Sequence, residues 1–377
     1  MTIHALRTQP SCTISDLARL TGLSRPAVED VVNDLVDQGW AELIGTQAAA
    51  MGRPARRYRF RAAARHVLGL DIGAHKIRGV LADLDGGVRS QATVAVQPEL
   101  SSRRRLARAG DVVARCLRAA GMAADELSAV AVATTGMVDD KGVVTLSTGI
   151  ADWAGVDVAG WLRSRVSCPV FVENDTKLAA VAEQWRGAAR GAEDLVYVLA
   201  GLRTAASLII GGQLHRGTGG AAGEIGLMPE TRWGFAQDHL TRWSASRPGG
   251  TRDAARAAFD AARSGDPSAR GAVRRYSRDL AVGVAMLVLA LDPELVVIGG
   301  GYSAAGDVLL DPLRRELEKR CLTVPNLVRS ELGGEAPVYG AIRLALDAVE
   351  TAAFAQDAAP ASVSYVDDQR RARAVDQ

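Results

Sequence analysis

The chain has 377 residues, of which 48% are hydrophobic and 23% are charged, and its formal net charge is +2, a balance typical of a globular protein with two or three domains. The four cysteines are scattered without a CxxC pair, which argues against a thiolate zinc cluster and against a disulfide framework. No segment approaches 18 uncharged apolar residues and no charged leader precedes an apolar run, so the sequence predicts a cytoplasmic protein.

Residues 1–62 have the pattern of a small DNA-binding domain. Residues 13–20 are expected to form a helix, and Ser24 is placed to cap a second helix after a short turn. Strands are expected at residues 40–44 and 57–60. Two helices followed by a two-stranded ribbon indicate a winged helix-turn-helix.

The second helix of such a domain enters the major groove and contacts base edges from its N-terminal turn. The candidate DNA contacts on this helix are Ser24, Arg25, Ala27 and Asn33. Four acidic residues on the same helix would be repelled by phosphates. The alternative is therefore that only the N-terminal end of the helix touches DNA.

A basic block follows the second helix: six arginines and no acidic residue lie between positions 53 and 65. Arg53, between a glycine and a proline, resembles a minor-groove insertion. Arg56 and Arg57 are predicted to contact phosphates, each contact adding about one unit to the salt dependence of binding. The alternative is a basic linker that is only solvated.

From residue 67 onward, apolar strands alternate with amphipathic helices, which indicates an α/β architecture. Strand–turn–strand openings near residues 67 and 195 predict two similar lobes, although the sequence has no clean repeat. The residues after about 356 are polar and alanine-rich without periodicity, which predicts a disordered tail. The sequence therefore predicts three parts of the chain: a winged helix-turn-helix domain at residues 1–62, an α/β body at residues 63–355 and a disordered tail at residues 356–377.

Four motifs between residues 67 and 349 then occur in a specific order. They are LDIGAHKIRGVLADLDG (70–86), VFVENDTKLAAVAE (170–183), RGTGGAAGEIG (216–226) and VVIGGGYSAAGDVLLDPL (296–313). In this order they resemble the first phosphate motif, the sugar and catalytic-base motif, the sugar-contact loop and the adenosine motif of the ROK family of bacterial sugar kinases and repressors. With the winged helix in front, the chain resembles the repressor branch.

The resemblance implies an actin-like ATPase (ribonuclease H-like) fold with two lobes, and it implies sugar contacts at Asn174, Asp175 and Glu224. Gly136 is expected near the same cleft, where the backbone must come close to the ligand. In a kinase, Asp175 would be the general base. The alternative for Asn174 and Asp175 is that they cap the helix that follows them.

The departures from the family pattern indicate that nucleotide chemistry has been lost. Leu227 stands where relatives have a histidine, and no cysteine lies between positions 168 and 321, so the zinc site of the family is expected to be absent. Leu202 and Arg203 interrupt the second phosphate loop, where glycines would let the backbone approach phosphate. His75 replaces a threonine and Gly149 an asparagine of sugar-binding relatives. Arg203 is expected to be a solvent-exposed hairpin residue, with a phosphate contact as the alternative.

These observations predict a regulator of carbohydrate-related genes, without enzymatic activity, zinc or bound ATP. Its expected partners are a near-palindromic DNA operator, a sugar or sugar-derivative effector, and further copies of itself in a homodimer or homotetramer associated with the nucleoid, with no membrane partner. One alternative is an active sugar kinase that carries a DNA-binding domain. Another is a dimeric DNA-binding protein without a ligand.

Overall fold

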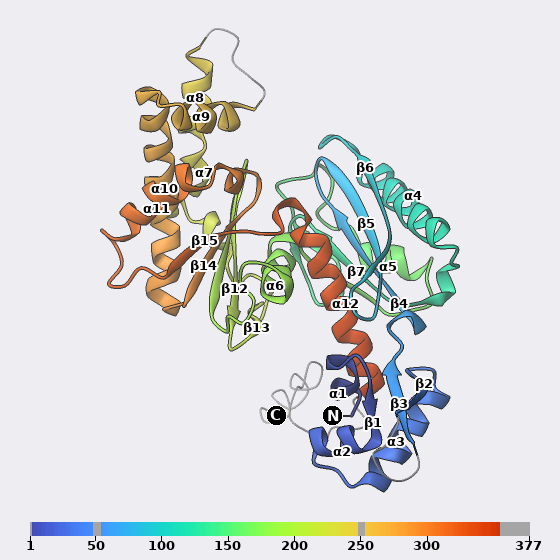
Figure 1. The fold of residues 1–377 in the computed structure, drawn as a ribbon. Helices are drawn as coiled ribbons and strands as arrows, with labels where there is room; N and C mark the ends of the chain where they lie inside the picture. The colour runs from blue at the N-terminus through green and yellow to red at the C-terminus, as the bar shows by residue number, and fades with distance from the viewer. Residues whose placement is uncertain (1, 48–53, 248–252, 355–377) are drawn as a thin grey trace, which may run out of the picture. The chain divides into compact units, whose positions relative to one another are not determined.

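The computed structural model describes residues 2–47, 54–247 and 253–354 (Figure 1). The chain divides into two compact units, one made of residues 1–64 with 347–377 and the other of residues 65–346. The first boundary lies within two residues of the predicted one, but the end of the predicted body belongs to the first unit. The predicted tail, 356–377, lies outside the described residues. No helix in the described ranges has the length and apolarity to cross a membrane.

The first unit is a winged helix-turn-helix with one added helix at each end. Its elements are α1 (Thr2–Thr8), β1 (Cys12–Thr13), α2 (Ile14–Thr21), α3 (Arg25–Asp37), β2 (Ala41–Gln47), β3 (Ala55–Phe60) and the end of α12 (Ala336–Phe354). Strand β3 pairs antiparallel with both β1 and β2. The two predicted helices and two strands are confirmed, whereas α1 and β1 were not predicted because they are too short to show a periodicity.

Local capping explains where α2 and α3 begin. Thr13 and Asp16 form a reciprocal capping box, with the Thr13 hydroxyl accepting from the Asp16 N–H at 3.1 Å. The Ser24 hydroxyl accepts from the N–H of Ala27, which confirms Ser24 as the N-cap of α3. Gly22, between the two helices, has φ +72°, a left-handed conformation that glycine adopts without strain.

The second unit consists of two lobes, each built on a five-stranded sheet (Figure 1). The strands of the first lobe are β4 (His66–Ile72), β5 (Lys76–Asp83), β6 (Val88–Ala95), β7 (Leu127–Thr134) and β10 (Val170–Asn174), in the spatial order β10-β7-β4-β5-β6. Helices α4 (Ser102–Ala120) and α5 (Val158–Arg163) contribute buried side chains to the core of this lobe. A separate two-stranded ribbon consists of β8 (Met137–Val138) and β9 (Val144–Leu146).

The second lobe repeats the plan of the first. Its strands are β11 (Leu195–Ala200), β12 (Thr204–Ile210), β13 (Gln213–Leu214), β14 (Leu295–Gly299) and β15 (Asn326–Arg329), in the order β13-β12-β11-β14-β15. In both sheets the first two strands form an antiparallel hairpin, and two later strands add in parallel on the other side of the first strand. The expectation of two similar lobes is confirmed.

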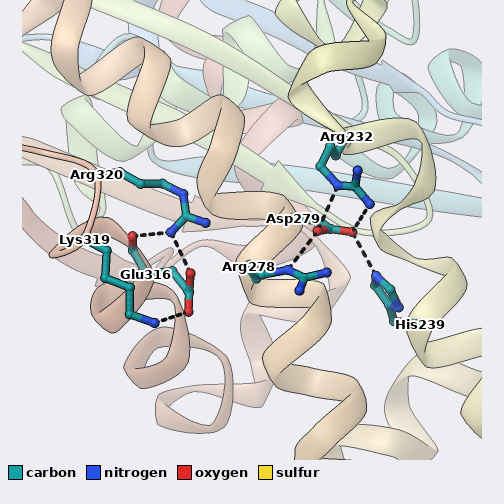
Figure 2. A network of polar contacts seen from close by, with 7 residues as sticks. All are labelled: Arg232, His239, Arg278, Asp279, Glu316, Lys319 and Arg320. Carbon is teal, nitrogen blue, oxygen red and sulfur yellow. Dashed lines mark hydrogen bonds and ion pairs between the residues drawn. The ribbon is translucent and has the colours of Figure 1, made fainter.

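The helices of the second lobe surround the long helix α10 (Pro267–Leu291). They are α7 (Trp233–Ala236), α8 (Asp238–Ala245), α9 (Ala254–Arg263) and α11 (Asp307–Leu317). The buried carboxylate of Asp279 on α10 accepts from Arg232 Nε at 3.0 Å and from His239 Nε2 at 2.8 Å (Figure 2). The indole N–H of the buried Trp233 donates to the carbonyl of Leu280 at 3.0 Å. These contacts attach the segment around α7 to α10.

A second charge cluster in Figure 2 stabilises the end of α11. Glu316 accepts from Lys319 and Arg320, each at 2.6 Å. These pairs hold the pKa of Glu316 below its usual range, through the hydrogen bond from Lys319 first and that from Arg320 next, against the opposing effect of burial. The cluster is local to one helix end and contributes little beyond it.

Two helices join the lobes. Helix α6 (Asp175–Arg186) follows β10 of the first lobe and packs its alanines against the second sheet. Helix α12 crosses α6 closely at Gly340, where a Cβ would collide with the carbonyl oxygen of Leu178. The same helix packs on β4 at Gly69, where a Cβ would lie 2.7 Å from Ile342. The two glycines therefore permit the close contact between α12 and both neighbours.

Candidate functional site

The candidate ligand site lies where three parallel strands of the first lobe end. The strand register places Ile72 of β4 beside Thr134 of β7, and Thr134 beside Asn174 of β10. The residues at these strand ends, Asp71 and Thr135 among them, therefore meet at one edge of the sheet. In α/β sheets, ligands bind at the carboxyl ends of the strands.

Asp175 lies at this edge, as the first residue of α6. Its carboxylate accepts from the Thr135 hydroxyl at 2.9 Å and from the backbone N–H of Thr176 at 2.7 Å. Burial raises the pKa of Asp175 above its usual range, although these hydrogen bonds and the charge of Arg203 oppose the effect. A half-buried carboxylate with part of its accepting capacity unused is suited to bind sugar hydroxyls.

Asn174 caps α6, as the structural alternative predicted. Its side-chain oxygen accepts from the N–H groups of Thr176 at 2.9 Å and Lys177 at 3.1 Å. Its amide nitrogen donates to the carbonyl of Gly136 at 2.9 Å. Asn174 thus positions both the start of α6 and the loop at Gly136.

Gly136 itself has φ +111°, and a Cβ there would collide with the carbonyl of Leu146. Only glycine fits this position without strain. The close neighbours of Gly136 are β9 and the Asn174 side chain, and its approach to a ligand stays a prediction.

Glu224 lies in the loop of the second lobe that follows Gly223, at the start of a short 3-10 turn (Glu224–Leu227). None of the described residues donates a hydrogen bond to its half-buried carboxylate. Burial raises the pKa of Glu224 and Asp175 raises it further, whereas the charge of Lys177 lowers it. The negative charge of Asp175 thus acts on Glu224 from the other lobe, and the role of both residues as sugar contacts stays a prediction.

Three further charged residues shape the site, and none was among the predicted contacts. Lys177 donates to the carbonyl of Gly220, and Arg216 forms an ion pair with the buried Glu173. Both contacts join the loop 216–226 of the second lobe to β10 and α6. The sequence feature that could have indicated this ion pair is Arg216, which begins the motif RGTGG. Its partner Glu173 is 43 positions away in the sequence, so no local pattern connects the two.

Asp71 is a buried carboxyl group at the end of β4, 4% exposed, and it was also missed. Burial first and the neighbouring charge of Asp175 second raise its pKa to about 7, although Lys76 and Arg78 oppose the shift. The sequence feature that could have indicated Asp71 as a site residue is its position as a single aspartate near the end of an otherwise apolar strand, in LDIG.

The turn between β11 and β12 carries Leu202 and Arg203. Arg203 is exposed, but its guanidinium donates to the carbonyl of Thr148 in the first lobe and, at 3.4 Å, to the Thr148 hydroxyl. Its exposure is as the sequence predicted, and the contact with Thr148, which joins the two lobes, was not predicted. Leu202 beside it is 68% exposed, and His75 is exposed as well.

The second candidate surface is helix α3 of the winged domain. Ser24, Arg25, Ala27 and Asn33 are all exposed, while Val28, Val32 and Leu35 face the core. Because successive residues are 100° apart on a helix, Asn33 lies on the exposed face, among the acidic side chains, and Arg25 lies at its N-terminal edge. This placement favours DNA contact through the N-terminal end of α3.

The basic block is less uniform than its sequence indicated. Arg57 donates to the Ser11 hydroxyl at 2.6 Å, and Arg59 and Arg61 pair with Glu42. Arg56, on the opposite face of β3 from Arg57, is exposed, and no described carboxylate pairs with it. Arg53 lies outside the described residues. Arg56 is therefore the described side chain of this block most available to a phosphate.

No group of three histidine, cysteine, aspartate or glutamate side chains within the described ranges is arranged to hold a metal ion. The segment after Glu224, where the resemblance places zinc ligands in other members, is instead attached to α10 through Trp233 and Asp279.

Comparisons with known proteins agree with this architecture. Residues 67–236 and 240–348 match the ROK family, and residues 1–49 match the MarR family. A glucokinase of Streptomyces coelicolor is 28% identical over 314 residues, which cover 74% of this chain and 96% of the relative. The xylose repressor of Bacillus subtilis is 22% identical over 350 residues, which cover 88% of this chain and 90% of the relative.

Among solved structures, the crystal structure of a ROK family transcriptional regulator, a homologue of the E. coli MLC protein, superimposes with a TM-score of 0.75. It is 20% identical and covers 95% of this chain and 98% of its own. This likeness confirms the two-lobe fold with a winged helix in front. Because the family match spans most of the sequence, the chain belongs to the ROK family.

Proposed function

We propose that this protein is a DNA-binding transcription regulator in which residues 65–346 bind a sugar or sugar derivative and do not transfer phosphate. The observation that supports this most is the combination of a winged helix with a ROK body whose second phosphate loop carries Leu202 and Arg203. Phosphoryl transfer depends on backbone donors held close to the phosphates. Two bulky side chains in that loop obstruct the approach.

The regulator would use its two sites as follows. The N-terminal end of α3 and Arg56 contact the operator, and a second copy of the chain contacts the other half of a near-palindromic site. Asp175 and Glu224, one from each lobe, bind hydroxyl groups of the effector. A ligand that favours one arrangement of the lobes shifts the population of chains that bind DNA.

DNA binding is tested with an operator identified by genome-wide occupancy, followed by fluorescence anisotropy at several salt concentrations. Arg56→Ala is expected to reduce the slope of log K against log salt by about one unit, because one phosphate contact is lost. Arg57→Ala is expected to reduce it less, since Ser11 binds that side chain. Arg115→Ala, an exposed arginine of α4, is the control of equal charge. An unchanged slope for Arg56→Ala would place β3 away from the DNA.

The alternative function, an active sugar kinase with an attached DNA-binding domain, is supported by the glucokinase relatives and by the retained Asp175. A coupled assay with ATP and a panel of hexoses and pentoses distinguishes the two. We expect no turnover above a blank without enzyme. Turnover that disappears in Asp175→Asn would establish the kinase, because this substitution removes the base and preserves the shape of the side chain.

A further inference from the structure

The side chain of Arg203 reaches the first lobe next to Gly149 and fills the space beside that glycine. A Cβ added at Gly149 would lie 2.6 Å from the methyl carbon of Thr135 and would collide with Nη1 of Arg203. The guanidinium thus occupies the space that any side chain at 149 would take. Gly149 and Arg203 are therefore a matched pair, in which a position without a side chain admits an arginine from the other lobe.

The same small region includes the sugar-binding carboxylate. The hydroxyl of Thr135, whose methyl carbon faces Gly149, donates to Asp175. A chain of contacts therefore leads from Gly149 through Thr135 to Asp175. Arg203 lies against Gly149, at the start of this chain. Its positive charge lowers the pKa of Asp175, as a minor contribution beside the larger, opposite effect of burial.

The Arg203 guanidinium also has unused capacity. Two of its nitrogens contact the carbonyl and the hydroxyl of Thr148, whereas a guanidinium has five N–H donors in a planar fork. Among the described residues no carboxylate oxygen lies within 4 Å of it. A cation at a ligand site with free donors and no ion pair is suited to bind a carboxylate or a phosphate group in two-point geometry.

We propose that Arg203 makes the cleft specific for an anionic sugar, one that carries a phosphate or a carboxylate group. The anionic group pairs with Arg203, and the sugar hydroxyls contact Asp175 and Glu224. The proposal rests on the sugar-binding function proposed above and specifies its ligand. A neutral sugar would leave the cation unpaired and would find no side chain at position 149.

The test compares matched ligands by isothermal titration calorimetry on the full chain. The panel contains neutral hexoses and pentoses, each with its terminal phosphate ester and its uronic or aldonic acid, and inorganic phosphate as the anion without a sugar. The wild-type chain is expected to bind one anionic member at least tenfold more tightly than its neutral parent. Arg203→Ala is expected to lower that affinity by about 10- to 100-fold, the effect of losing a charge-assisted hydrogen bond. Arg115→Ala is expected to change neither.

Gly149→Asn combined with Arg203→Gly and Thr135→Ser is expected to reverse the preference, because the amide then has the space that the guanidinium and the Thr135 methyl occupied, while the hydroxyl that binds Asp175 is kept. Equal binding of neutral and anionic members, or an anionic preference that survives Arg203→Ala, would overturn the proposal and leave sugar sensing intact. Failure of every sugar to bind the wild-type chain would refute the sugar-sensing function itself, and the proposal with it. Comparing the affinities of the phosphate esters and the sugar acids identifies which anionic group is bound.

Discussion

Asp71 offers the sharpest quantitative prediction, because its carboxyl group is buried and close to a second acid. The pKa of this group in the folded protein is about 7, compared with 3.8 in a solvated chain. Between these values the folded state holds a proton that the unfolded state has released, so the free energy of unfolding falls as the pH rises from about 4 to about 7. At ~1.36 kcal/mol per pKa unit, the full penalty above pH 7 is up to about 4 kcal/mol.

Asp71→Asn removes this penalty while preserving the shape of the side chain. We expect the variant to be more stable than the wild-type chain at pH 8 by about 2 to 4 kcal/mol, and the difference to vanish near pH 4. Urea unfolding followed by tryptophan fluorescence measures both, since five of the six tryptophans belong to residues 65–346. Asp140→Asn, at an exposed turn carboxylate, is the control. A destabilised Asp71→Asn at pH 8, or an unchanged pH slope, would refute the reasoning.

Three further substitutions test the packing and capping. Asp279→Asn is expected to lower stability by about 1 to 2 kcal/mol at pH 7, because its arginine and histidine donors lose their charged partner. Those donors depress the pKa of Asp279 despite its burial, so the loss should shrink as the pH falls below 3.8 and through that lowered pKa. A loss that grows as the pH falls would contradict this. Gly340→Ala should cost about 1 to 3 kcal/mol in thermal unfolding. The control Gly271→Ala should cost nothing, because a Cβ at this helical glycine would make only ordinary contacts with two arginine side chains. Thr13→Ala should cost about 1 kcal/mol through the lost capping box, measured by the unfolding of the winged domain.

Much of the fold could be predicted from local patterns. The apolar strands of both sheets and the cap at Ser24 depend on neighbours within a few positions, and the structure has them where the sequence placed them. The two-lobe plan followed from the repeated hairpin openings and from the order of the motifs. Asp175 and Glu224 were each predicted as sugar contacts because each lies in a recognisable motif.

Contacts between distant parts of the chain were not predictable in this way. Arg203 binds Thr148 across 55 positions of sequence, and Arg57 binds Ser11 across 46. Both are arginines whose long side chains can reach many partners, so their composition alone indicates only positive charge. The structure therefore separates Arg56 from Arg57, which the sequence had treated alike.

What the sequence determined by itself was the order of strands and helices, the motifs at the strand ends and the presence of Leu202 and Arg203 in the turn between β11 and β12. These properties are local, because they follow from side-chain period and backbone freedom. Only the tertiary structure decided that Asp71 is a buried acid and that Arg203 lies over Gly149. Both depend on burial and on charges brought together from separate strands and from the other lobe, and no local pattern encodes those distances.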